Sequence, residues 1–140
     1  MVVYGMLRYF RHASALIVHA TRDLHAPSGT KRSPHWPAVR KAYLADHPIC
    51  AACGGFTALE VHHVVPFAKN PSKELDPLNL ITLCMAIDRH CHLVLHGGSF
   101  RAYDTNVVHD ATAVLRARRA HDTATLQKIL DRVRAERVPL

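Results

Sequence analysis

The side chains best suited to chemistry in this 140-residue chain are concentrated in one stretch, from Cys50 to His96. In order, the stretch contains a Cys-x-x-Cys pair, two adjacent histidines, Asn79, Cys84, Cys91 with His92 directly after it, and His96. Thiolates and imidazoles are the side chains that bind zinc and other first-row metals. The stretch therefore predicts metal chemistry, and its two kinds of ligand favour two separate sites.

The cysteines form two pairs, Cys50 with Cys53 and Cys84 with Cys91. Four thiolates can surround Zn²⁺ tetrahedrally, and such a site stabilises a small fold. Six residues separate the second pair, so a longer loop must return the last thiolate, and His90 is an alternative ligand. The cysteines could instead be buried free thiols. A redox pair is disfavoured because no thioredoxin-like βαβ pattern surrounds them. We favour structural zinc.

The histidines have the spacing of a second metal site. Adjacent residues of a strand point to opposite faces, so one of His62 and His63 can face a metal while the other addresses a water or a phosphate. His92 and His96 are four residues apart, which places both on one face of a helix. Imidazoles from a strand and a helix could hold a divalent ion with open positions. The alternative is surface histidines, since the chain has twelve.

The charge balance points to a polyanionic partner. Eighteen Lys and Arg against eleven Asp and Glu give a net charge of +7, and neutralising phosphates with such residues releases counterions. The basic residues that we expect to contact nucleic acid are Lys31, Arg32, Arg40, Lys41, Arg116 and Arg119. Each could also be part of a solvated helix face. No homeodomain, zinc-finger array or helix-turn-helix pattern is evident, so low sequence specificity is expected.

The elements that must position these groups can be read from the pattern. Ser33 and Pro34 predict the N-cap and first residue of a helix that ends before Pro48. Glycines after Cys53 predict a knuckle turn. Two strand-like runs, a short helix stopped by two glycines and two further helices follow. Their expected ranges are Leu59–Val65, Leu78–Cys84, His90–Leu95, Ala111–Ala120 and Thr123–Arg137, the last capped by Asp122.

The N-terminal region carries weaker signals. Met1–Ala26 has weak helical periodicity, and Ala26–Ser33 has the composition of a turn-rich linker. The apolar stretch Ala13–Ala20 is broken by His19 and is far shorter than the ~20 residues that cross a bilayer. We therefore expect a cytoplasmic protein with no membrane partner.

Ordered motifs in the central stretch resemble the HNH nuclease family. The runs VHHVVPF, ELDPLNLITLC and CHLVLHGG carry the resemblance, and SPHWPAVRKAYLADHPICAACG is similar to the lead-in of compact phage and bacterial members. The resemblance covers roughly Ser33–Ala111. It implies an α+β fold, a small ββα-metal (His-Me finger) core with a structural zinc site, flanked by helices at both ends. The expected organisation is an extension at 1–32, a nuclease domain at 33–111 and a helical extension at 112–140.

The resemblance also implies roles for single residues. His62 and His92 would bind the catalytic metal, with His96 as a second helix ligand. His63 would be the general base. Asn79 would hold the loop between the strands and orient His63. The physical chemistry agrees, since histidine titrates near neutral pH and can accept a proton from the attacking water.

The function implied is metal-dependent hydrolysis of phosphodiester bonds in DNA, by nicking or double-strand cleavage, with double-stranded DNA as the expected partner. The expected ends are 3′-hydroxyl and 5′-phosphate. The expected cofactors are structural Zn²⁺ and a catalytic divalent ion, Mg²⁺, Mn²⁺, Ni²⁺ or Zn²⁺. Further candidate partners are a second copy of the chain or a phage packaging protein, in the cytoplasm of a bacterium or phage-infected host. The alternative is a non-catalytic zinc-knuckle module that binds nucleic acid, which would have no need of the histidines and Asn79 together.

Overall fold

The computed structural model describes residues 30–99 and 101–140. The predicted helical periodicity of Met1–Ala26 lies outside these residues, as does most of the predicted linker. The helices are α2 (Trp36–Asp46), α3 (Cys91–Leu95), α4 (Val107–Arg119) and α5 (Thr123–Glu136), and the strands are β1 (Leu59–His63), β2 (Leu80–Cys84), β3 (Ala102–Tyr103) and β4 (Val138–Pro139). The α+β class is confirmed. Among the described helices, none is long and apolar enough to cross a bilayer.

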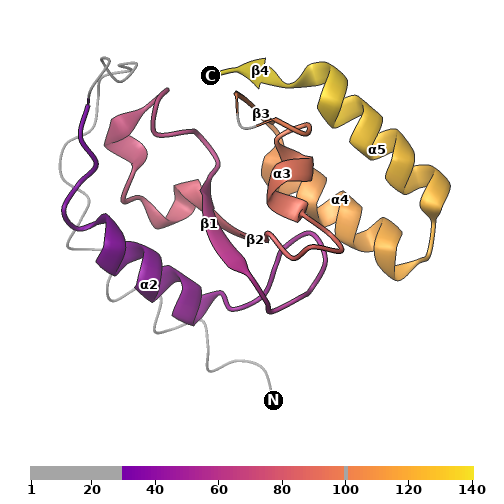
Figure 1. Ribbon diagram of the computed structural model, residues 1–140, viewed down its shortest axis with the longest axis horizontal. Helices are drawn as coiled ribbons and strands as arrows, with labels where there is room; N and C mark the ends of the chain where they lie inside the picture. The colour runs from indigo at the N-terminus through magenta and orange to yellow at the C-terminus, as the bar shows by residue number, and fades with distance from the viewer. Residues whose placement is uncertain (1–29, 100) are drawn as a thin grey trace.

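The centre of the fold is an antiparallel hairpin of β1 and β2 followed by α3. In its register His62 lies opposite Ile81 and His63 opposite Leu80. All five residues of β2 are buried, as are the last three of β1. Helix α2 lies on one side of the hairpin and the α4–α5 pair on the other, with α3 between them (Figure 1). This arrangement buries the hairpin on both sides, which holds the two histidines of β1 in fixed surroundings.

Helix α2 is fastened to β2 by polar contacts. The Tyr43 hydroxyl donates to the Leu80 carbonyl at 2.7 Å, and the Thr82 hydroxyl donates to the His47 carbonyl at 2.9 Å. The helix begins at Trp36, two residues later than predicted. The Ser33 hydroxyl oxygen does accept the His35 N–H at 3.2 Å, but it caps the preceding turn.

The short helix α3 ends at Leu95, just before Gly97 and Gly98, as the sequence predicts. Gly97 has φ +65°, a left-handed conformation that costs glycine little. The Gly98 N–H donates to the Leu93 carbonyl at 3.0 Å, which closes the last turn. At the other end His90 precedes the helix with φ 42°, so the chain turns sharply between β2 and α3. The sharp turn brings α3 back beside the hairpin.

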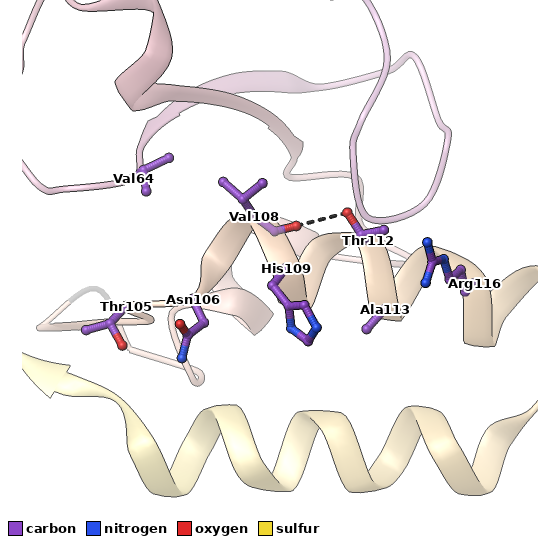
Figure 2. A pocket seen from close by; sticks show the side chains of 8 residues that line it. All are labelled: Val64, Thr105, Asn106, Val108, His109, Thr112, Ala113 and Arg116. Carbon is purple, nitrogen blue, oxygen red and sulfur yellow. Dashed lines mark hydrogen bonds between the residues drawn. The ribbon is translucent and has the colours of Figure 1, made fainter.

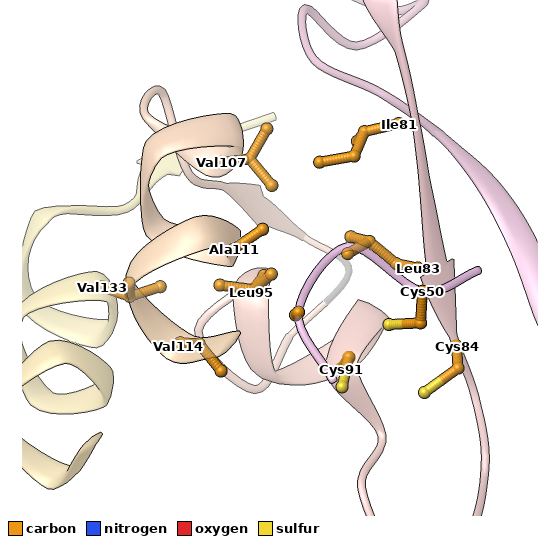
Figure 3. Close-up of a cluster of buried hydrophobic side chains, with 11 residues drawn as sticks. Cys50, Ile81, Leu83, Cys84, Cys91, Leu95, Val107, Ala111, Val114 and Val133 are labelled. Atoms are coloured by element: carbon orange, nitrogen blue, oxygen red, sulfur yellow. The ribbon is translucent and has the colours of Figure 1, made fainter. Parts of the chain in front are cut away.

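Helices α4 and α5 form an antiparallel pair that closes the core. The helix expected to begin at Ala111 begins four residues earlier, at Val107. Val107 is fully buried and points toward the side of β2 that carries Ile81 (Figure 3), so tertiary packing overrides the weak helix propensity of this segment. Helix α5 begins as predicted, and the Asp122 carboxylate accepts the Thr125 N–H at 2.9 Å.

One hydrophobic core joins the hairpin, the knuckle and the helical pair. Leu83 of β2, Leu95 of α3, Val114 of α4 and Val133 of α5 are each at most 1% exposed (Figure 3). The boundary expected between residues 111 and 112 falls inside α4, so the C-terminal helices share this core. The two-residue pairing of β3 with β4, which joins the chain end to the segment before α4, was not predicted because so short a strand leaves no pattern.

Candidate active site and metal centres

The four cysteines converge on one point. Their sulfur atoms all lie within 4.8 Å of one another, and the sulfurs of Cys53 and Cys84 are 3.6 Å apart. All four are free thiols. A turn at residues 87–89 returns the last sulfur to the others across the six-residue spacing. His90 is not part of the group. Four sulfurs at this separation suit tetrahedral zinc.

The backbone of the first cysteine pair is folded as a knuckle. The Gly54 N–H donates to the Cys50 carbonyl at 2.8 Å, and the Cys50 N–H donates to the Gly55 carbonyl at 2.7 Å. Gly54 has φ +74°, which a residue with a side chain rarely adopts. The Gly55 N–H points at the Cys53 sulfur, 3.4 Å away. Such N–H groups stabilise a thiolate, so the turn is arranged for a metal-bound sulfur.

Two arginines balance the negative charge of the sulfur cluster. Arg118 of α4 donates to the Cys91 sulfur at 3.1 Å, and Arg89 donates to the Cys53 sulfur at 3.7 Å. A hydrogen bond from Cys91 lowers the pKa of Cys50 to about 5, and donating that proton raises the pKa of Cys91. Protons are thus shared among closely packed sulfurs, which is where a metal ion would replace them.

Three histidines form a second cluster, separate from the sulfurs. One ring nitrogen each of His62, His92 and His96 lies within 4.8 Å of the others. The Nδ1 atom of His62 is 3.0 Å from the Nε2 atom of His92, and the ring centroids of His62 and His96 are 4.7 Å apart. The Nε2 atom of His62 is buried with no hydrogen-bond partner. A buried polar atom left unpaired is costly unless a ligand engages it.

The hydrogen bonds and pKa values of this cluster suit a metal ion. The Nδ1–H of His96 donates to the Ala102 carbonyl at 2.6 Å, which leaves Nε2 with its lone pair. Burial, followed by the neighbouring imidazoles, lowers the pKa of His62 to about 2, and burial lowers that of His92 to about 4. Burial also lowers the pKa of His96. Neutral imidazoles bind metals, so the residues present fit a divalent ion.

His63 faces away from this cluster, as the alternation of a strand predicts. Its Nε2 atom is 2.9 Å from the Glu74 main-chain carbonyl, and its ring centroid is 4.5 Å from that of Trp36. A carbonyl can only accept, so Nε2 carries the hydrogen and Nδ1 carries the lone pair. Burial lowers the pKa of His63. A neutral imidazole with a fixed tautomer next to a three-histidine cluster can accept a proton.

Asn79 fastens the loop between the strands. Its side-chain oxygen accepts the Val65 N–H at 2.7 Å, and its amide donates to the carbonyls of Val65 and Lys73 at 3.0 and 3.1 Å. Both residues that Asn79 binds lie close to His63 in the chain or to its partner. Val65 comes two residues after His63, and Lys73 directly precedes Glu74, whose carbonyl binds the His63 ring. The amide is therefore placed to act on His63 through the backbone.

The buried carboxylate of Glu74 was not anticipated from the sequence. Glu74 is 4% exposed, and its carboxylate accepts from the Arg32 guanidinium at 3.1 Å and from the Ser33 N–H at 2.9 Å. The guanidinium in turn lies 5.0 Å from the Trp36 ring centroid and 4.8 Å from that of Phe67. Glu74 thus ties the lead-in to α2 to the loop that orients His63. Nothing in the local pattern marks its burial, which arises from tertiary packing.

The predicted basic residues occupy different surroundings. Arg32 is bound to Glu74 and Arg40 to Glu60, the latter at 2.9 Å. Arg116 lines a surface pocket on α4. Lys31, Lys41 and Arg119 are exposed. Two of the six residues are therefore held in ion pairs, and the contact of all six with nucleic acid remains a prediction.

A hairpin followed by a helix, with imidazoles from both facing one point and a sulfur cluster beside them, is consistent with the ββα-metal class of folds. Residues 50–97 match the family of HNH endonucleases. This match bears out the resemblance of the central motifs to that family, over residues 50–97. No curated protein and no solved structure matches the chain.

Proposed function

We propose that the protein is a metal-dependent DNA endonuclease in which residues 33–111 carry both ligand clusters of the nuclease domain, while the rest of α4 and α5 complete the same core. The observation that carries the proposal is that two adjacent histidines of β1 have different partners on opposite faces of the strand. His62 joins His92 and His96 in a cluster of neutral imidazoles, while the ring of His63 is held by the Glu74 carbonyl on the other face. A zinc-knuckle module that only binds nucleic acid has no need of this arrangement.

His63 acts as the general base. Its Nδ1 lone pair takes a proton from a water molecule as the water oxygen forms a bond to phosphorus. The bond from phosphorus to the 3′ oxygen of the sugar breaks, and the leaving oxygen takes a proton from solvent. The products are a 3′-hydroxyl and a 5′-phosphate. The Glu74 carbonyl holds the imidazole in one tautomer throughout, and Trp36 restricts the ring from its face.

The three-histidine cluster is where the catalytic divalent ion would be held, by His62, His92 and His96. When bound, the ion supplies positive charge to the phosphate and leaving oxygens as negative charge develops there. Because the ligands are imidazoles, Mn²⁺, Ni²⁺ and Zn²⁺ are candidates besides Mg²⁺. The four cysteines hold a separate zinc ion whose role is structural.

The substrate is DNA, bound through its backbone. The net charge of +7 and the absence of a recognised base-reading motif favour phosphate contacts, which position a duplex without reading its sequence. A single active site cuts one strand at a time, so a double-strand break requires two sequential nicks or two copies of the chain.

The test is incubation of supercoiled plasmid with the purified protein and Mg²⁺, Mn²⁺, Ni²⁺ or Zn²⁺. We expect nicked, then linear DNA, with ends that a ligase reseals because they carry 3′-hydroxyl and 5′-phosphate groups. His63→Ala should lose at least 100-fold in rate, on the order expected for a general base, while keeping its fold, zinc and DNA affinity.

The matched control is His121→Asn, an exposed histidine between α4 and α5 outside both clusters; it should cut plasmid like the unchanged protein. Plasmid that is bound but never cut, with any of the four ions, would contradict the proposal and favour the non-catalytic zinc-knuckle module. Cleavage by His63→Ala at the normal rate would remove His63 from the mechanism.

A further inference from the structure

The exposed side of α4 carries a groove that the catalytic residues do not use. It is a pocket of about 450 Å³ lined along the helix by Thr105, Asn106, Val108, His109, Thr112, Ala113 and Arg116, with Val64 across from them (Figure 2). These positions repeat every three or four residues, so they form one stripe on the helix surface. Five of the eight lining residues are polar and three, Val64, Val108 and Ala113, are apolar. The small side chains of Thr112 and Ala113 lie in the middle of the stripe, where a polymer backbone can approach closely.

One end of the groove lies at the active site. Val64 directly follows His63 at the end of β1 and lines the groove. The segment that leads into α4 is also fixed there, because the Ala102 carbonyl accepts from Nδ1 of His96. A strand cut at the histidines would therefore have the groove beside it on one side of the break.

The charge of the groove favours an anionic occupant. Asp110 is the single carboxylate of α4, and it is fully buried, bound to Arg132 of α5. No lining residue is acidic, while Arg116 is cationic. Among the described contacts Arg116 forms no ion pair, unlike Arg118, which is committed to the Cys91 sulfur. In α4 the acidic Asp110 is therefore buried, while the basic Arg116 is exposed on the groove side.

We propose that this α4 groove binds the sugar-phosphate backbone of the DNA beside the cut. The inference rests on the proposed function and adds a substrate-binding surface to it. From Asn106 to Arg116 the helix rises about 15 Å, and one strand of a duplex has a phosphate every 3.4 Å or so along its axis. The groove therefore covers roughly four nucleotides, with hydroxyl and amide donors near the cut and Arg116 at the far end.

The test compares two matched charge changes. Thr112→Glu places a carboxylate in the groove, four residues before Arg116; Ala124→Glu places one on exposed α5, four residues before Lys128. Both change the net charge equally and offer the same helical ion pair. Affinity for a fluorescein-labelled 20-base-pair duplex is measured by anisotropy across a salt series, in a His63→Ala background so that the duplex stays intact.

We expect Thr112→Glu to weaken binding about tenfold and Ala124→Glu less than twofold. Arg116→Gln, a second variant, should lower the slope of log affinity against log salt by about one, as for one lost phosphate contact, while Arg134→Gln on α5 should not. The proposal that the groove binds DNA would be overturned if Thr112→Glu and Ala124→Glu had equal affinities and Arg116→Gln and Arg134→Gln had equal salt slopes. Plasmid cleavage by the unchanged protein, measured separately, tests the proposed function, so the two can fail independently.

Discussion

The ring of His63 is held by the main chain of Glu74, whose side chain is at the same time bound to Arg32 and the Ser33 N–H. One buried residue therefore connects the general base to the segment before α2. The main-chain carbonyl fixes the tautomer, and the carboxylate fixes where that carbonyl lies. This connection makes the position of His63 depend on contacts between residues that are more than 40 positions apart in sequence.

The first prediction concerns this connection. Glu74→Ala removes the acceptor for two donors, so the loop that carries the carbonyl loosens; we expect a loss of about 1–3 kcal/mol in the free energy of unfolding and roughly tenfold in kcat. KM should change less, because His63 acts on the reacting water. Urea titration and plasmid kinetics measure both.

Glu74→Gln is the control that separates positioning from folding. Its amide oxygen can still accept the Ser33 N–H, so it should recover most of the lost kcat. Exposed Glu136→Ala should have neither effect. If both substitutions at position 74 left kcat unchanged at a temperature where they are folded, Glu74 would have no part in placing the base.

The residues that could be predicted from the sequence are those whose chemistry leaves few alternatives. Four cysteines and a strand–helix set of histidines were expected to converge, and the structure brings them together because strand alternation and helical spacing are fixed by backbone geometry. Glu74 and Arg118 could not be predicted. An acidic residue in a loop and an arginine on a helix are exposed by default, and only the tertiary fold decides otherwise.

The second prediction is that zinc holds the fold together. Cys84→Ser removes a ligand at the centre of the core, where the sulfur is 1% exposed. The variant should bind less than one zinc per chain and lose its cooperative thermal transition, because metal affinity contributes directly to the stability of so small a fold. Zinc content and circular dichroism measure the two effects.

Chelation provides the companion experiment. Stripping zinc from the unchanged protein should lower the melting temperature, and adding one equivalent of Zn²⁺ should restore it, whereas Cys84→Ser should not respond. A cysteine variant that melts like the unchanged protein would show that the sulfurs are packed free thiols.

The third prediction assigns Arg118 to the stability of the zinc site. Its guanidinium donates to the buried Cys91 sulfur at 3.1 Å, and such outer contacts tune a metal site by about 10- to 100-fold in affinity. Arg118→Leu should therefore release zinc to a chromogenic chelator about tenfold faster. Arg119→Leu, at the next and exposed position, is the control. Identical release rates for the two variants would mean that the guanidinium does not support the site.

The last prediction concerns a buried pair of carboxyl groups between α4 and the segment before it. The Asp104 carboxylate accepts the Asn106 N–H at 2.8 Å through one oxygen, and its other oxygen is buried without a partner. Burial and the nearby Asp110 raise the pKa of Asp104 to about 6. Burial by itself would raise the pKa of Asp110 as well. The hydrogen bonds from Arg132 and His109 nevertheless hold the pKa of Asp110 below its usual value.

Because the pKa of Asp104 is higher in the folded chain than in the unfolded one, the folded state binds more protons between about pH 4 and 6. Stability must then fall as pH rises through that window and stay level above it. Asp104→Asn keeps an oxygen that accepts the Asn106 N–H. Its amide N–H can donate to Asp110 and does not ionise at these pH values. It should be more stable than the unchanged protein at pH 8 by about 1–2 kcal/mol and equally stable at pH 4.

Urea unfolding at the two pH values measures this difference. Asp131→Asn, on the exposed side of α5, removes the same charge without the burial and should show no such dependence on pH. An Asp104→Asn variant that is less stable at pH 8 would mean that the charged carboxylate is stabilised by a partner in the folded protein, contrary to its surroundings. A gain at pH 8 that disappears at pH 4 is the result expected of a carboxyl whose pKa the fold raises, because its buried charge costs stability only where the carboxyl is ionised.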